Sequence, residues 1–289
     1  MSGNSDNKVM VNGRAVPGGE ARVCALDRGF LYGDGFFETT RIYAGRPFRF
    51  EEHIERMQAS CRWADWERVP EAERLRADVD RLIELNDVQD GYLRVSVSPG
   101  PDEGGTELSD FTVLIQARPM DLPPPGEAHP LRLVKSDYAR GEHCPTVAHK
   151  TLSYFENKLA LSEGKKEGAD EVYFLNHRGH LAEGAISNLF FVADGTVHTP
   201  APSCGLLPGI ARKTVLKLCE RESIALKTGR YGEEELLEAD EAFCTNSLRG
   251  VMPVRSVAGR QPFESVPGAV TSRLQALYGR MLREACAEH

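Results

Sequence analysis

Five prolines fall within the stretch RPMDLPPPGEAHP, residues 118–130. Proline fixes φ and lacks a backbone N–H, so it interrupts helices and central strands alike. A segment this rich in proline favours an extended linker. At 289 residues the chain is long enough to build two domains on either side of it. We therefore expect an N-terminal domain over 1–120, a linker over 121–130 and a C-terminal domain over 131–289.

The N-terminal part alternates strand-forming and helix-forming patterns. FFETTRIYAGRPFRF has strong strand formers on both sides of a turn, and amphipathic helical patterns follow it, the second after Pro70. The expected elements are two strands within 36–50 around a turn at 44–46, helices at 51–63 and 70–87, and strands at 91–99 and 110–118 around a glycine-rich loop at 99–109.

The C-terminal part mixes helices and short strands in the same way, so the fold class expected for the whole chain is α+β. The expected strands are near 131–135, 171–175, 187–193, 224–228 and 240–245, and the expected helices begin at about 153 and span 211–222 and 268–287.

Charge and cysteine content exclude several classes of protein. The net charge of −8 disfavours a non-specific nucleic-acid binder, which presents a basic face. The seven cysteines are widely spaced and form no CxxC pair, which argues against a disulfide framework and a zinc ribbon. The polar N-terminus and the absence of a long apolar run predict a cytoplasmic protein with no membrane segment.

The histidines give no metal signature. His143 lies near His149 and His177 lies near His180, but neither pair has a carboxylate or cysteine at ligand spacing. We expect structural or surface roles for them and no metal site.

Lys150, in HKTLSYFENKLA, stands where the pattern does not need a lysine. Leu152, Phe155 and Leu159 recur at helical spacing, so a helix is expected from about Ser153. A lysine just before a helix lies near the positive end of the helix dipole, which is mildly unfavourable. Lys150 is either a solvated surface residue or a residue placed for chemistry.

Three further features indicate an anion site, although each also has an ordinary structural explanation. Gly209 precedes a helix whose first N–H groups point outward, as an anion requires. The loop that begins TNS at Thr245 offers hydroxyl, amide and backbone donors. Arg56 carries a forked guanidinium that suits phosphate, yet it can equally be a solvated helix residue.

Glu183 lies at the edge of an apolar strand in LAEGAISNLFFV. It is either an exposed acid in a turn or a buried partner for a protonated ring nitrogen. The second role is the one that an electron-accepting cofactor requires.

In order along the chain, these motifs resemble the class IV family of pyridoxal-phosphate aminotransferases, which includes branched-chain aminotransferases, D-amino-acid aminotransferases and aminodeoxychorismate lyases. The resemblance covers residues 11–254 and implies a two-domain fold of type IV, with a smaller N-terminal α/β domain and a larger C-terminal pseudo-barrel domain. Its landmarks are DRGFLYGDGFFETTRIYAGRPFRFEEHIERM, HKTLSYFENKLA, EGAISNLFFV, GLLPGIARK and TNSLRGVMPV.

The resemblance implies roles for individual residues and pyridoxal 5′-phosphate as the cofactor. Lys150 matches the lysine that bonds covalently to the cofactor and moves the substrate α-proton. Glu183 matches the partner of the pyridinium nitrogen. Ala211 stands where the family usually has threonine, so a hydroxyl contact is lost and weaker cofactor binding is expected. The remaining residues matched to the cofactor site are Arg56, Ser187, Asn188, Ile210, Asn246 and Ser247.

Substrate residues are matched less specifically. Tyr92 and Arg94 share one face of a strand and resemble the pair near the substrate carboxylate of branched-chain enzymes, although Arg94 can equally pair with an acid elsewhere. The loop at 99–109 lacks the arginine–x–histidine pair typical of D-amino-acid enzymes, and it supplies three acids and no base for a dianionic lyase substrate. The family positions on the substrate side are Tyr32, Phe37, Glu38 and Arg41.

The predicted activity is transfer of an amino group between an amino acid, branched-chain or related, and a 2-oxo acid. The alternatives are an aminodeoxychorismate lyase and a D-amino-acid aminotransferase. DRGFLYGDG is similar to both of these branches, and TNSLRGVMPV and KTLSYFENKLA are similar to lyases. A non-catalytic relative is the alternative of a different class. The family also implies a homodimer with the active site near the subunit interface.

Overall fold

A computed structural model of the chain describes residues 7–66, 69–101 and 111–287. The chain forms two compact units. The N-terminal unit comprises Met1–Leu122, His149–Ser153 and Ala285–His289, and the C-terminal unit comprises Pro123–Ala148 and Tyr154–Glu284. The division after Leu122 falls in the proline-rich segment, but the sequence does not predict that His149–Ser153 returns to the N-terminal unit.

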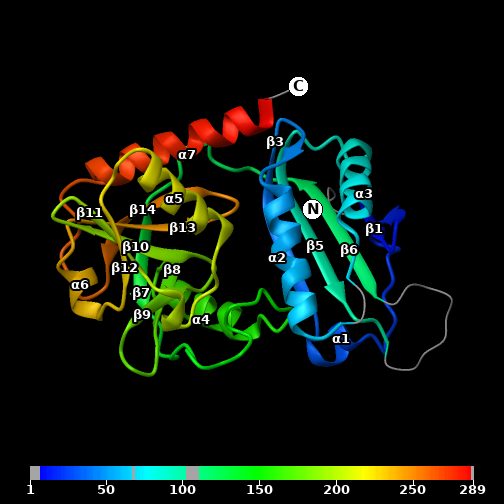
Figure 1. Cartoon of the computed structure of the whole chain (residues 1–289), viewed down its shortest axis with the longest axis horizontal. Helices are drawn as coiled ribbons and strands as arrows, with labels where there is room; N and C mark the ends of the chain where they lie inside the picture. The colour runs from blue at the N-terminus through cyan, green and yellow to red at the C-terminus, as the bar shows by residue number, and fades with distance from the viewer. Residues whose placement is uncertain (1–6, 67–68, 102–110, 288–289) are drawn as a thin grey trace. The chain divides into compact units, whose positions relative to one another are not determined.

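The N-terminal unit is a six-stranded antiparallel sheet with two long helices on one face (Figure 1). The strand order is β2-β1-β6-β5-β3-β4. The elements are β1 (Lys8–Val11), β2 (Arg14–Pro17), α1 (Arg28–Tyr32), β3 (Phe36–Tyr43), β4 (Arg46–Pro47), α2 (Phe50–Trp63), α3 (Ala72–Leu85), β5 (Asp90–Ser98) and β6 (Thr112–Pro119).

Alternation of side chains along β5 explains why the helices cover only one face of this sheet. Leu93, Val95 and Val97 are buried in a core that also takes Ile54 from α2 and Val79 from α3. Full burial of an aliphatic side chain of this size contributes about 1.5–3 kcal/mol. The residues between them along the strand point to the other face, so β5 gives the sheet one apolar and one polar side.

The segment that carries Lys150 pairs with the start of β3. Leu152 N donates to Gly35 O at 2.9 Å, and Phe36 and Thr151 form an antiparallel bridge. A Cβ on Gly35 would lie 2.3 Å from the backbone oxygen of Val97 on β5, so this position needs a glycine. The backbone around Lys150 is therefore fixed by a sheet.

The C-terminal unit is an eight-stranded mixed sheet with order β12-β11-β10-β13-β14-β7-β8-β9. β9 contacts β10 and β11, although it stands at the other end of this order, so the sheet curls on itself. The elements are β7 (Leu131–Lys135), α4 (Phe155–Lys166), β8 (Glu171–Leu175), β9 (Leu181–Gly184), β10 (Asn188–Ala193), β11 (Thr196–Pro200), α5 (Ile210–Arg221), β12 (Leu226–Gly229), α6 (Glu233–Leu237), β13 (Glu241–Asn246), β14 (Gly250–Val257) and α7 (Ala269–Ala287).

The predicted α+β class is confirmed, together with the helices and strands expected in both halves. The glycine-rich loop at 99–109 lies mostly outside the described residues. Five strands were not expected from the sequence: β1, β2, β9, β11 and β14. The stretch after Asn246 is polar and reads as a turn, so the sequence pattern did not predict β14, which starts at Gly250.

The helix after Lys150 differs from the expectation in two respects. It begins at Phe155, so Lys150 does not adjoin its first turn and is not opposed by the helix dipole. Phe155 was expected on the buried face, but it is 78% exposed, and the buried residues of α4 are Ala160 and Gly164.

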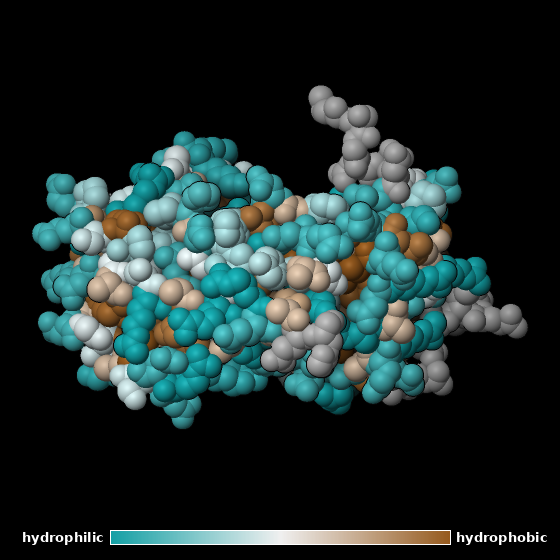
Figure 2. Space-filling model, turned by 90° about the horizontal axis from the view of Figure 1, so that it is seen from above, coloured by the Kyte–Doolittle hydropathy of each residue, from teal (hydrophilic) through white to brown (hydrophobic). Residues whose placement is uncertain are grey.

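Hydrophilic residues cover most of the face drawn in Figure 2, with apolar patches between them. Within the described ranges, none of the helices is both long and apolar enough to cross a membrane.

Candidate active site

Lys150 lies in the N-terminal unit beside two residues that the sequence also singled out. Its carbonyl accepts a hydrogen bond of 2.8 Å from Phe37 N, and its Nζ lies 4.5 Å from the centroid of the Phe37 ring. Arg94, on β5, places its Cζ 3.7 Å from the same centroid. The structure thus gathers Lys150, Phe37 and Arg94.

His149 fixes the residue before the lysine. Its ring stacks on Trp63, with 4.0 Å between centroids, and its Nδ1 lies 2.9 Å from Ser60 Oγ. Burial lowers the pKa of His149, which favours the neutral ring. His149 therefore has the structural role that was expected, because it packs the segment that carries Lys150 against α2.

Arg56 is held by a buried carboxylate. Its Nε and Nη2 donate to the two oxygens of Glu38 at 2.7 and 2.6 Å, and His53 Nδ1 lies 2.6 Å from Oε2 of the same carboxylate. Burial raises the pKa of Glu38, but Arg56 and His53 outweigh it and bring the pKa to about 2. The side chain that was predicted to grip phosphate is therefore oriented by an ionised partner.

Glu38 and Phe37 were both predicted to line the substrate side, but they lie on different faces of the sheet, and that role stays a prediction for Glu38. Glu38 and Phe37 are successive residues of β3, so their side chains point to opposite faces of the sheet. Phe37 lies on the face of Arg94, whereas Glu38 points to α2 and pairs with His53 and Arg56.

The other predicted substrate residues are spread more widely. Tyr92 shares the face of Arg94, as the alternation predicted. Arg41 is 1% exposed and forms an ion pair with Asp90, with Nη2 and Oδ2 2.6 Å apart. Tyr32, at the end of α1, is 67% exposed. A substrate role for Arg41 or Tyr32 stays a prediction.

In the C-terminal unit, Glu183 is a buried acid, 7% exposed, near the end of β9. Its Oε2 accepts a hydrogen bond of 2.9 Å from Leu207 N, and its Oε1 lies 3.4 Å from Arg140 Nε. The sequence left open whether this acid is exposed or buried. The structure places it in the interior, between the sheet and the loop before α5.

The N-terminus of α5 is shaped for an anion. Its N-cap is Gly209, and no side chain caps the helix within the described chain. Asn188 Nδ2 donates to Leu207 O at 2.8 Å, and a Cβ on Gly209 would lie 2.2 Å from Asn188 Oδ1. The first turn begins at Ile210 and Ala211, and because Gly209 has no side chain to cap it, its first N–H groups are of the kind that bind an anion.

Two residues assigned to the cofactor site have local partners. Ser187 Oγ donates to Glu171 Oε2 at 2.8 Å. Asn246 Oδ1 accepts from Leu248 N at 3.1 Å and from Arg249 N at 2.9 Å, which closes the turn that carries Ser247. Ser187 and Asn246 shape the loops of this region, and direct contact with a cofactor stays a prediction for them and for Ser247.

Sequence reasoning missed Arg140 and Glu171. Glu171 is buried and accepts hydrogen bonds from Ala185 N at 3.1 Å and Ile186 N at 3.2 Å, besides that from Ser187. Burial raises the pKa of Glu171, and these donors oppose the rise. Neither Arg140 nor Glu171 belongs to a recognisable sequence motif, so the spacing of residues along the chain does not identify them.

Leu207 joins the two features of the C-terminal unit. Glu183 binds its N–H, Asn188 binds its carbonyl, and α5 begins three residues later. A buried carboxylate and an open helix N-terminus suit a ligand with a cationic ring nitrogen and a phosphate. The residues present therefore fit pyridoxal phosphate.

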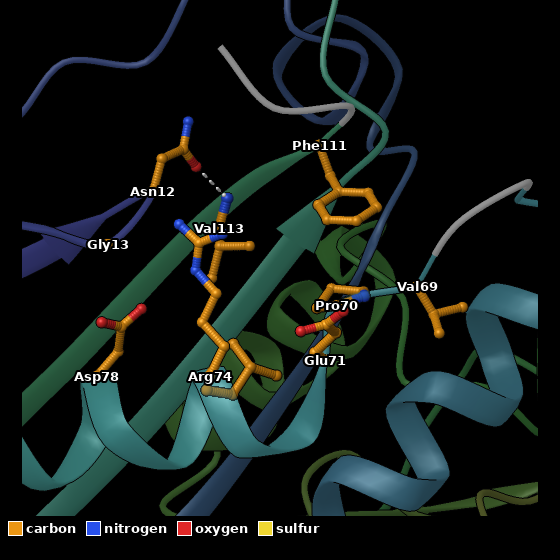
Figure 3. Close-up of a pocket in the computed structure, with 10 residues that line it drawn as sticks. Asn12, Gly13, Val69, Pro70, Glu71, Arg74, Asp78, Phe111 and Val113 are labelled. Carbon is orange, nitrogen blue, oxygen red and sulfur yellow. Dashed lines mark hydrogen bonds between the residues drawn. The ribbon is translucent and has the colours of Figure 1, made fainter.

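A separate cavity of about 420 Å³ lies in the N-terminal unit between the turn after β1 and the start of α3 (Figure 3). Arg74 and Asp78 project from α3 along its wall, and Asn12 Oδ1 accepts a hydrogen bond of 2.7 Å from Val113 N. No predicted site residue lines this cavity.

Comparison with known proteins connects these features to chemistry. The family described as amino-transferase class IV matches residues 35–257. The chain is 33% identical to the aminodeoxychorismate lyase of Bacillus subtilis, over 97% of this chain and 96% of that one. It is 29% identical to the D-alanine aminotransferase of Bacillus licheniformis, over 96% and 98% of the two chains.

Solved structures are also similar. The branched-chain aminotransferase of the archaeon Thermoproteus uzoniensis, determined with norvaline, has a TM-score of 0.86 and 28% identity to this chain. The similarity covers 96% of this chain and 95% of that one. A further similar structure, also of a branched-chain amino acid aminotransferase, was determined with pyridoxamine 5′-phosphate.

Proposed function

The chain belongs to the class IV aminotransferase family, and we propose that it transfers an amino group between an amino acid, branched-chain or related, and a 2-oxo acid. The observation that carries this proposal is the placement of Lys150 and Arg94 on one ring, that of Phe37. An amine and a carboxylate-binding cation beside an apolar surface suit an amino acid with an apolar side chain.

Family membership confirms the predicted family, fold class and cofactor, because class IV aminotransferases use pyridoxal 5′-phosphate. The relatives include both transaminases and a lyase, which catalyse different reactions.

The residues proposed to hold the cofactor are those that the sequence indicated. Glu183 would pair with the ring nitrogen, and the first N–H groups of α5, at Ile210 and Ala211, would bind the phosphate with Arg56 and Ser247. When bound, pyridoxal phosphate supplies an electron-accepting ring that stabilises negative charge at the substrate Cα. The other contributions come from the protein.

Lys150 contributes the proton transfer. A neutral Nζ would remove the proton from the substrate Cα as a general base, and the resulting ammonium would deliver that proton to the cofactor carbon that carries the amino group. The backbone bond from Phe37 N and the bridge at Thr151 hold the start of the lysine side chain, so its Nζ moves only by rotation of the side chain.

Arg94 contributes substrate orientation. Its Nε donates to Ser96 Oγ at 3.1 Å and its guanidinium lies on Phe37, which fixes the direction of the fork. A fixed guanidinium binds a carboxylate through two parallel hydrogen bonds. Arg94 therefore orients the substrate carboxylate, while Phe37 offers an apolar surface.

The test is spectroscopic. Purified protein loaded with pyridoxal phosphate is mixed with L- or D-amino acids, without an oxo acid. A transaminase leaves the amino group on the cofactor, so visible absorption falls and near-ultraviolet absorption rises. Lys150→Ala should abolish this change, whereas Lys166→Ala, at an exposed lysine of α4, should retain it. Full turnover by Lys150→Ala would contradict the assignment and favour a non-catalytic role for this site.

A lyase is the second candidate, favoured by the 33% identity to the Bacillus subtilis enzyme. It would release pyruvate from aminodeoxychorismate and leave the visible spectrum unchanged after each cycle. If no amino acid of either hand converts the cofactor while aminodeoxychorismate yields pyruvate, the transaminase proposal is wrong. Conversion by D-amino acids alone would assign the D-amino-acid alternative.

We also propose a homodimer, as the family implies. Sedimentation equilibrium at micromolar concentration should give twice the chain mass of 31.9 kDa. A fully active species at the monomer mass would refute it.

A further inference from the structure

Arg140 is a buried arginine that no motif or comparison assigns. It is 6% exposed and lies beside the end of β8, where its N–H donates to Leu175 O at 2.8 Å. Its guanidinium lies on the ring of Phe174, with Cζ 4.0 Å from the centroid. Backbone and ring together fix the direction of the side chain.

The guanidinium points to Glu183 but is incompletely hydrogen-bonded. Its Nε lies 3.4 Å from Glu183 Oε1, close enough for an ion pair. Within the described part of the chain, neither Nε nor Nη2 has a hydrogen-bond partner. Nη1 lies 3.5 Å from Asn157 Oδ1 and 3.6 Å from the half-exposed Glu156.

Burial of N–H groups without acceptors opposes folding, so such groups need an explanation other than stability. The neighbouring carboxylate supplies one. A permanent positive charge at this distance, in a protein interior, strongly favours the ionised form of Glu183. The N–H of Leu207 binds its other oxygen, so both oxygens of Glu183 are held from fixed directions.

We propose that Arg140 is a positioning residue, which keeps Glu183 ionised and aligned for the ring nitrogen of the cofactor. This inference rests on the proposed function, in which Glu183 is the partner of that nitrogen. Arg140 acts through Glu183, so its effect on cofactor binding requires the carboxylate to be present.

A double-mutant cycle tests that requirement. The dissociation constant of pyridoxal phosphate is measured by absorbance titration for the wild type, Arg140→Met, Glu183→Gln and the double variant. Arg140→Met should weaken binding about tenfold, the lower end of the loss seen when a partner of a metal-binding side chain is removed. In the Glu183→Gln background the same substitution should have little effect. A purely structural role would give equal losses in both backgrounds.

Arg255→Met is the matched control, because Arg255 forms an exposed ion pair with Asp170 at 3.0 Å in the same unit. It should bind cofactor like the wild type. Arg140→Lys keeps the charge and should bind more tightly than Arg140→Met. If Arg140→Met does not fold, Arg140→Gln replaces it in the cycle, since it removes the charge and keeps polar atoms.

The outcomes separate this inference from the proposed function. If the wild type does not bind pyridoxal phosphate, the proposed function fails. If it binds and Arg140→Met binds equally well, or loses the same factor in both backgrounds, only the role of Arg140 is refuted.

Discussion

Replacement of Glu38 by glutamine removes the one negative charge in the buried group that Glu38 forms with His53 and Arg56. The wild-type carboxylate accepts two hydrogen bonds from Arg56, at 2.7 and 2.6 Å, and one from His53 at 2.6 Å. A glutamine keeps the shape but cannot accept at both positions. We expect Glu38→Gln to destabilise the N-terminal unit in a manner that depends on pH.

The magnitude follows from the pKa of Glu38. Its pKa falls from 4.5 to about 2 on folding, and each unit corresponds to about 1.4 kcal/mol. Because the folded pKa is the lower one, the stabilisation is fully present well above pH 4.5 and is lost as the pH falls toward 2. We expect Glu38→Gln to cost about 3 kcal/mol at pH 7 and about 1 kcal/mol at pH 3.

Tryptophan fluorescence reports this unit selectively, because Trp63 and Trp66 both belong to it and are the two tryptophans of the chain. Cofactor-free wild type and Glu38→Gln are unfolded with guanidinium chloride at pH 7 and at pH 3. The difference in free energy of unfolding is then compared between the two pH values.

Glu51→Gln is the control, since Glu51 forms an ion pair with Arg76 at the surface and its side chain is 70% exposed. It should change stability by less than about 0.5 kcal/mol. The reasoning is refuted if the difference between wild type and Glu38→Gln is the same at pH 3 as at pH 7, because the ionisation of Glu38 would then carry no stability.

Three further substitutions test separate parts of the structure. Gly209→Ala should weaken pyridoxal phosphate binding in an absorbance titration, because the new Cβ would collide with Asn188, whereas Gly19→Ala, which meets no atom within 4 Å, should not. Glu171→Gln should lower the free energy of unfolding by about 1–3 kcal/mol, measured by circular dichroism, since buried donors lose their acceptor; unchanged stability would contradict its structural role. His149→Ala should slow transamination and alter tryptophan emission, and normal turnover would show that Lys150 does not need the contact with α2.

The local sequence pattern predicted most of the helices and strands. It also predicted that Tyr92 and Arg94 lie on the same face of a strand, because alternation of side chains is a property of the strand itself. It also places Phe37 and Glu38 on opposite faces. The family motif assigns both residues to the substrate side, although alternation directs only one of them to the face of Arg94.

Residues whose roles depend on tertiary contacts could not be identified from the sequence. Arg140 and Glu171 become important only because distant strands bring Glu183 and Ser187 to them. The start of α4 was misjudged for a related reason. Hydrophobic spacing suggested a helix near Lys150, but pairing with β3 holds that segment extended, and the helix begins only at Phe155.

The return of His149–Ser153 to the N-terminal unit has a consequence for how the protein can be divided and made. The chain passes between the units four times, after Leu122, Ala148, Ser153 and Glu284. A single cut in the proline-rich segment thus yields two fragments, of which the first contains the sheet that supports the lysine and the second contains the lysine. During synthesis, the N-terminal unit can be completed only after residues beyond the linker have been made, because His149–Ser153 belong to it. The backbone pairing that holds Lys150 against β3 therefore joins a segment made before the linker to one made after it.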